Sequence, residues 1–166
     1  MKELRTNAAL CARDESGATI VEFSITLSLL FTCIFGIMVC SMALYADHFV
    51  TDAAKEATRY AMVRGSSWGS TSCSTFSSYS CVATSSNVAS FVNSVAPPGI
   101  STSRISVTTT WPGKDPTGQT CDSAQGNNSP ACVVNVQVQY SFNFLLPFVP
   151  FGTIDLSGVS SDVITR

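Results

Sequence analysis

A long uncharged run near the N-terminus dominates the pattern of polar and apolar positions. Residues 23–46 contain no charged side chain, and their polar members are Ser, Thr, Cys and Tyr. A helix of this length would extend about 36 Å, which is enough to cross a hydrocarbon core of about 30 Å. The run is too long for the apolar core of a signal peptide, which has about 7–15 residues. The pattern therefore predicts one membrane-spanning helix.

The helical pattern continues beyond this run. Residues 47–64 contain neither Pro nor Gly, and Gly65 follows at a position suited to end a helix. We therefore expect one helix over residues 18–64, of which residues 47–64 form the spine of a small head. The alternative is a plain anchor with a short juxtamembrane helix. The apolar positions that share one side of the extension at the helical period are Phe49, Ala53, Ala57, Tyr60 and Ala61.

The C-terminal half of the chain predicts strands. Val, Tyr and Phe alternate with Asn, Gln and Ser over residues 134–144, and a weaker alternation covers 105–111. A last strand is expected at about 153–164. Three antiparallel strands packed on the long helix would bury both apolar faces, so the predicted fold class is α+β, with the head over residues 65–166.

A short amphipathic helix is expected before these strands. Val88, Phe91, Val92 and Val95 have helical spacing, and the run Pro97–Gly99 stops the pattern. Ser85 or Ser86 is the expected N-cap residue. Residues 65–86 before it are rich in Ser and Thr and are expected to form a loop.

Cysteine usage points to an oxidising compartment, since seven cysteines occur in 166 residues. The spacings C-x7-C and C-x10-C do not fit zinc ligands. Of the three connectivities open to these four residues, we expect the local pairs Cys73–Cys81 and Cys121–Cys132. They follow the apolar run, so residues 47–166 are placed outside the cytoplasm. Equal numbers of Lys and Arg flank the run and do not decide the orientation.

Composition argues against catalysis. Charged residues make up 12% of the chain, and His48 is its one histidine. No phosphate-binding loop, dinucleotide-binding motif, nucleophile elbow or H-E-x-x-H motif is present. We therefore expect no enzyme activity, no metal site and no cofactor, and an anchored hydrolase is the least supported alternative. The formal charge of −2 argues against a nucleic-acid partner.

One carboxylate interrupts the start of the apolar run. An ionised side chain within lipid costs about 2.5–3.5 kcal/mol, so Glu22 needs a partner or a position near the headgroups. In one interpretation it only flanks the span at the interface. In the other, a cut after Gly17 makes Glu22 the fifth residue of the mature chain. The new α-amino group at Ala18 then pairs with this carboxylate or with that of a neighbouring subunit.

The same residues resemble a known family. The run Gly17–Phe23 looks like the type IV pilin processing motif, with a glycine before the cut and a glutamate five residues after it. Together with Phe35–Ile37, Ala43–Tyr45 and the Ala-rich run Asp52–Ala61, it makes the chain similar to the TadE/TadF-like minor pseudopilins of the Flp (Tad) pilus system. The segment Val134–Leu156 fits the same family.

The resemblance implies a pilin-like fold and a role in pilus assembly. A prepilin peptidase would remove residues 1–17 as a leader, leaving a transmembrane helix over residues 18–46. Glu22 and Phe23 would then guide assembly with other pilin and pseudopilin subunits and the Tad machinery. The implied location is the bacterial inner membrane, crossed once, with the head in the periplasm or outside the cell.

A second class of function stays open, namely a membrane-anchored binding module or adhesin that keeps residues 1–17. Its ligand face would use the aromatic side chains near the Ser/Thr-rich loops. These are Trp68, Phe76, Tyr79 and Trp111.

An apolar segment between the last two expected strands is too interrupted by proline to be a strand interior. It either folds back over the edge of the sheet or forms an exposed contact with another subunit. The residues of this candidate interface are Leu145, Leu146, Phe148 and Phe151.

Overall fold

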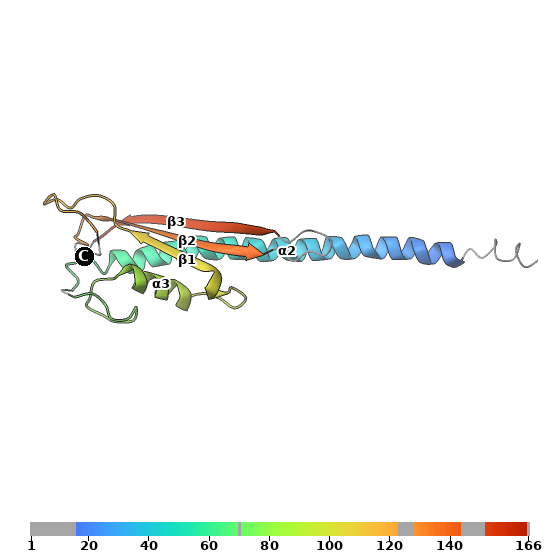
Figure 1. Ribbon diagram of the computed structural model, residues 1–166, viewed down its shortest axis with the longest axis horizontal. Helices are drawn as coiled ribbons and strands as arrows, with labels where there is room; N and C mark the ends of the chain where they lie inside the picture. Colours follow the sequence, from blue (N-terminus) through green and yellow to red (C-terminus); the bar gives the residue numbers. More distant parts are fainter. Residues whose placement is uncertain (1–15, 70, 123–127, 144–151, 166) are drawn as a thin grey trace, which may run out of the picture. The chain divides into compact units, whose positions relative to one another are not determined.

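Figure 1 shows the computed structural model of the chain, which describes residues 16–69, 71–122, 128–143 and 152–165. The chain divides into two compact units; the first holds the N-terminal helix through Cys40, and the second begins at Ser41 and holds the rest of the described chain. The predicted α+β class is confirmed. The elements are the helices α2 (Ser16–Met62) and α3 (Ser85–Ser94), the 3-10 helix η1 (Thr102–Arg104), and the strands β1 (Ile105–Thr110), β2 (Val133–Asn143) and β3 (Thr153–Val163).

Helix α2 has 47 residues and would measure about 70 Å. It ends at Met62, two residues before the expected end, and Gly65 is not in the left-handed conformation of a glycine cap. Other backbone groups satisfy the last carbonyls instead. The N–H of Arg64 donates to the Ala61 oxygen at 3.1 Å, and the N–H of Thr165 donates to the Met62 oxygen at 3.2 Å. The end of α2 is therefore fixed by the chain that follows β3.

The three strands form one antiparallel sheet in the order β1-β2-β3. The predicted strands are confirmed, with ends that differ by at most one residue. Val138 in the central strand pairs with Val107 of β1 and with Gly158 of β3. The predicted alternation also holds, since every second residue of β2 from Val134 to Tyr140 is buried.

The core of the second unit lies between α2, the sheet and α3. The buried side of α2 consists mostly of alanines, whose short side chains let the sheet approach the helix closely. The hydroxyl of Thr58 on this side donates to the Ser160 carbonyl of β3 at 3.3 Å. The buried α2 residues of the core are Ala46, Val50, Ala53, Ala54, Ala57, Tyr60 and Ala61, and α3 adds Val88 and Val92.

The N-cap residue of helix α3 differs from the predicted one. Thr84 is the N-cap, rather than Ser85 or Ser86, because Asn87 lies three residues after it and completes a capping box. The N–H of Asn87 donates to the Thr84 hydroxyl at 3.3 Å, and the Thr84 N–H donates to the Asn87 side-chain oxygen at 3.0 Å. The helix ends at Ser94, before the prolines, and the N–H of the C-cap residue Val95 donates to the Phe91 carbonyl.

Candidate functional site

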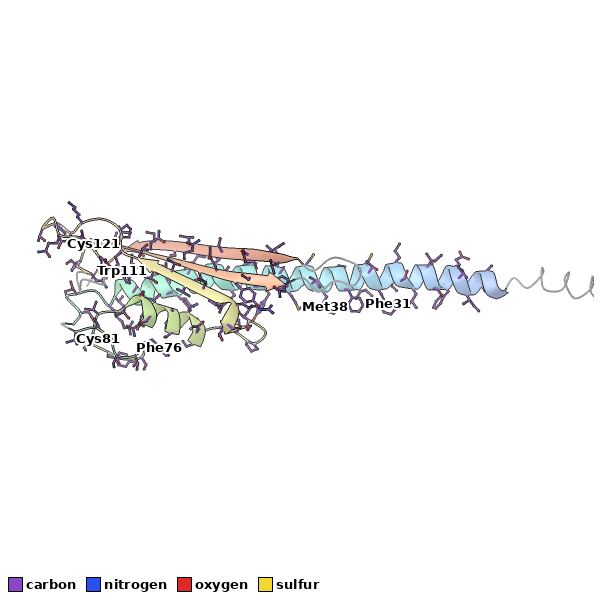
Figure 2. The ribbon with its side chains drawn as sticks, viewed as in Figure 1. Phe31, Met38, Phe76, Cys81, Trp111 and Cys121 are labelled. Atoms are coloured by element: carbon purple, nitrogen blue, oxygen red, sulfur yellow. A yellow bond between two sulfur atoms is a disulfide. The ribbon has the colours of Figure 1, made fainter. Side chains whose placement is uncertain are left out.

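The surface of α2 in the first unit is apolar on all sides. Its side chains are exposed nearly throughout, and Ile37 has 69% of its surface accessible. Figure 2 labels two of them, Phe31 and Met38. A helix that is apolar on every side is stable in lipid or in a bundle, and not as a free surface in water. Within the described chain, α2 is the one helix long and apolar enough to cross a membrane.

Four hydroxyl groups of this apolar stem are satisfied inside the helix. The Thr26 hydroxyl, for example, donates to the Glu22 carbonyl oxygen at 2.9 Å. In hydrocarbon a hydroxyl without a partner would cost several kcal/mol, so these internal bonds make the stem compatible with a bilayer. The other hydroxyls that donate to a carbonyl three or four residues earlier are those of Ser24, Ser28 and Thr32.

Glu22 is the one charged residue between Gly17 and Ala46, and its side chain is exposed. Helix α2 begins at Ser16, so the Gly17–Ala18 peptide bond lies in its first turn. Ala18 and Glu22 are four residues apart and therefore share one helix face. An α-amino group at Ala18 would place a positive charge at the positive end of the helix dipole, and a carboxylate one turn away would offset this unfavourable arrangement. The next residue, Phe23, is exposed.

Two disulfides crosslink the loops of the head. Cys73–Cys81 and Cys121–Cys132 have Cα–Cα distances of 5.1 and 5.7 Å, which are normal for such bonds. The pairing is the one expected from the sequence. Figure 2 labels Cys81 and Cys121, one from each bond. Cys33 and Cys40 in the stem are free and exposed.

The four aromatic residues of the expected ligand face do not form one surface. Trp111 is buried, with 8% of its surface accessible, and Phe76 packs against the core. The phenolic hydroxyl of Tyr60 donates to the Phe76 carbonyl at 2.6 Å, which fixes the disulfide loop to α2. Sequence reasoning could not separate a buried aromatic residue from an exposed one within a polar loop. Only Trp68 and Tyr79 of the four are exposed.

Buried polar groups in the head have structural roles. The Asp115 carboxylate accepts hydrogen bonds from the N–H and hydroxyl of Thr117 and from the N–H of Gln119. These bonds lower the pKa of Asp115, and the bond from the Thr117 hydroxyl has the largest effect. Asn128, which the sequence analysis did not single out, is buried and donates to the Ala83 carbonyl at 3.2 Å. In the described residues, no three His, Cys, Asp or Glu side chains gather in a metal-binding group.

Two parts of the predicted site fall outside the described residues. Residues 1–15 of the expected leader are one. The other is the apolar segment 144–151, with Leu145, Leu146, Phe148 and Phe151.

The exposed apolar helix and the disulfide-stapled α+β head define a protein with a candidate single-pass membrane anchor. Residues 17–59 match the TadE-like protein family, and this match supports a TadE-like protein of the Tad pilus system. It begins at Gly17, covers most of α2 and confirms the TadE-like resemblance drawn from this part of the sequence. TadE-like pilus components are structural proteins rather than typical enzymes. No curated protein and no solved structure matches the chain.

Proposed function

We propose that the chain is a minor pseudopilin that takes part in assembly or priming of a Flp/Tad-type pilus after a prepilin peptidase cleaves the Gly17–Ala18 bond. One observation carries this proposal. The exposed, apolar stem of α2 holds a single carboxylate, Glu22, one helical turn after Ala18. A plain membrane anchor has no need of a charge there, since each buried charge costs about 2.5–3.5 kcal/mol or more.

Assembly in this proposal is a transfer of α2 from lipid to a bundle of similar helices. The stem keeps an apolar environment during the transfer, because neighbouring helices replace the acyl chains. Glu22 gains a partner in the bundle, the α-amino group of Ala18 on a neighbouring subunit. An ion pair in a low-dielectric setting depends strongly on geometry, so the pair would favour one docking register over others.

The proposed organisation has four parts: a leader over residues 1–17, a transmembrane helix over 18–46, a helical extension over 47–64 and an extracytoplasmic head over 65–166. The two disulfides support an oxidising compartment for the head. We therefore place the protein in the bacterial inner membrane with its head in the periplasm or outside the cell. The proposed partners are the prepilin peptidase, pilin and pseudopilin subunits and the Tad assembly machinery.

A membrane-anchored binding module is the second candidate function. It is favoured by Tyr79, whose side chain is 81% exposed in the disulfide loop, and by the exposed Trp68 nearby in sequence. Exposed aromatic side chains are common anchors of binding interfaces. This candidate requires residues 1–17 to be retained.

The first test is intact-mass and N-terminal analysis of the protein isolated from the membrane of its own cells. The proposal expects a chain that begins at Ala18. A chain that still begins at Met1 would overturn processing and leave the binding module as the better candidate.

The second test compares two carboxylate variants on the same helix. Glu22→Gln removes the charge with little change of shape and is expected to abolish or strongly reduce pilus formation in cells that lack the native chain. Glu56→Gln is the matched control, since Glu56 is an exposed carboxylate of α2 in the helical extension. Formation of both disulfides in each variant verifies that the head still folds. Normal piliation with Glu22→Gln would contradict the assembly role.

A further inference from the structure

A groove of about 350 Å³ lies in the second unit, where α2, the segment before η1 and the end of β2 meet. Its lining is mostly apolar or aromatic, with one cation. Met42 and Tyr45 come from α2, and each is about half exposed. The lining also includes Ile100, Arg104, Tyr140 and Phe142.

The groove lies at the level of α2 where the membrane-spanning run finishes. About 20 helical residues cross a hydrocarbon core. Counted from Phe23, they end at about Met42, and the first charge after them is Asp47. Tyr45 thus falls at the depth of the headgroups, where Tyr and Trp are enriched in membrane proteins. The apolar lining is therefore continuous in sequence with the lipid-facing stem.

The positive charge of the groove favours a negatively charged ligand. Arg104 is exposed, and its guanidinium has no carboxylate partner within the described part of the chain. A second groove, of about 250 Å³, shares Tyr45 but is lined by Asp52 and Glu56. A negative headgroup would be attracted to the first groove and repelled from the second. An arginine beside an apolar slot fits a phosphate attached to a hydrocarbon chain.

We propose that the groove between Tyr45 and Arg104 binds a phospholipid of the leaflet nearest the head. Its acyl chain packs against Met42, Ile100 and Phe142, and its phosphate pairs with Arg104. The bound lipid fixes the depth of α2 and holds the base of the head at the bilayer surface. The proposal needs α2 to span the membrane, but it does not depend on leader cleavage or on pilus assembly.

Photo-cross-linking of the full chain tests this site. The protein is reconstituted in phosphatidylcholine vesicles that contain phosphatidylglycerol with a diazirine in the acyl chain, and the labelled peptides are identified by mass spectrometry. The expected result is labelling of residues 98–104 and 140–143 in addition to the stem. Labelling of the stem alone, or of the stem and only residues 144–151, would overturn the proposal. Absence of any stem labelling would also overturn it and would separately contradict a membrane-spanning α2.

Two cation variants test the phosphate contact. Arg104→Gln is expected to lower labelling of the groove, relative to the stem, by about fivefold, the effect of one basic residue near anionic lipid. Lys114→Gln is the matched control, because Lys114 is an exposed cation of the head that does not line the groove. Arg104→Lys is expected to restore most of the labelling. Equal labelling with Arg104→Gln and Lys114→Gln would show that Arg104 does not hold the phosphate.

Discussion

Gly158 of β3 lies directly on the backbone of α2 at Val50. A Cβ atom at Gly158 would be 2.6 Å from the carbonyl carbon of Val50 and 2.7 Å from the Cα of Thr51. Real Cβ atoms essentially never come within 3.0 Å of such atoms. Because Gly158 pairs with the fully buried Val138, this contact sets the distance between the sheet and the helix.

Substitution of Gly158 is expected to destabilise the head. Gly158→Ala should lower the free energy of unfolding by about 1–3 kcal/mol, because its neighbours are backbone atoms that cannot move aside as a flexible side chain can. The measurement is denaturant unfolding of the full chain in detergent, followed by tryptophan fluorescence, to which the buried Trp111 and the exposed Trp68 both contribute. Gly152→Ala is the matched control, since a Cβ there meets nothing within 4 Å. Equal effects of the two variants would contradict the close contact.

Tyr60→Phe is expected to loosen the disulfide loop. The variant removes the 2.6 Å hydrogen bond to the Phe76 carbonyl but keeps the ring stacked on Phe91, at 4.8 Å between centroids. The expected loss is about 1 kcal/mol of unfolding free energy. The control is Tyr79→Phe, because Tyr79 is largely exposed. Its expected effect is near zero, and a similar loss in both variants would argue against the bond.

The head is also expected to lose stability at high pH, because Tyr60 ionises there. Burial raises the pKa of Tyr60, while the nearby Arg64 lowers it in part. The unfolded chain therefore releases this proton more readily than the folded one. The contribution to stability is complete below the unfolded pKa of about 10 and is lost as the pH rises through the higher folded value. Unfolding curves between pH 8 and 11 should show a weaker pH dependence for Tyr60→Phe than for the native chain.

The stability of the head is expected to depend on pH in the acid range, because Asp115 becomes protonated there. Hydrogen bonds to its carboxylate, led by that of the Thr117 hydroxyl, lower its pKa. The stability it contributes is present above the unfolded pKa of about 3.9 and is lost as the pH falls through the lower folded value. Asp115→Asn should therefore destabilise the head at pH 7 but much less at pH 3. The exposed Glu56→Gln variant serves as the reference, and the same pH dependence in both would contradict this role.

The two disulfides are expected to contribute separately. Replacement of Cys73 and Cys81 by Ser should cost about 2.5–3 kcal/mol, since closing a loop of this size removes that much chain entropy from the unfolded state. The Cys121 and Cys132 pair should give a similar value. The matched control is Cys33→Ala, because Cys33 is a free cysteine of the stem. Its replacement should leave unfolding of the head unchanged.

Local patterns predicted most elements of the fold but not their ends. The α2 spine and the alternation of β2 could be predicted because helix and strand periodicity are properties of neighbouring residues. The predicted N-cap of α3 was wrong because Thr84, Ser85 and Ser86 are chemically similar. Only the capping box that Asn87 forms with Thr84 distinguishes them. The end of α2 was placed too late because distant backbone at Thr165 satisfies its last carbonyl, that of Met62.

The sequence by itself determined the apolar stem, the position of Glu22 five residues after Gly17, and the strand pattern of the head. Each depends on order along the chain. Only the tertiary structure decided which glycines are required by close contact. It also decided that Trp111 and Asn128 are buried, and that Tyr45 and Arg104 line one groove. These features depend on surfaces that are distant in sequence and meet only when the sheet packs on α2. The periodicity of the sequence therefore cannot predict them.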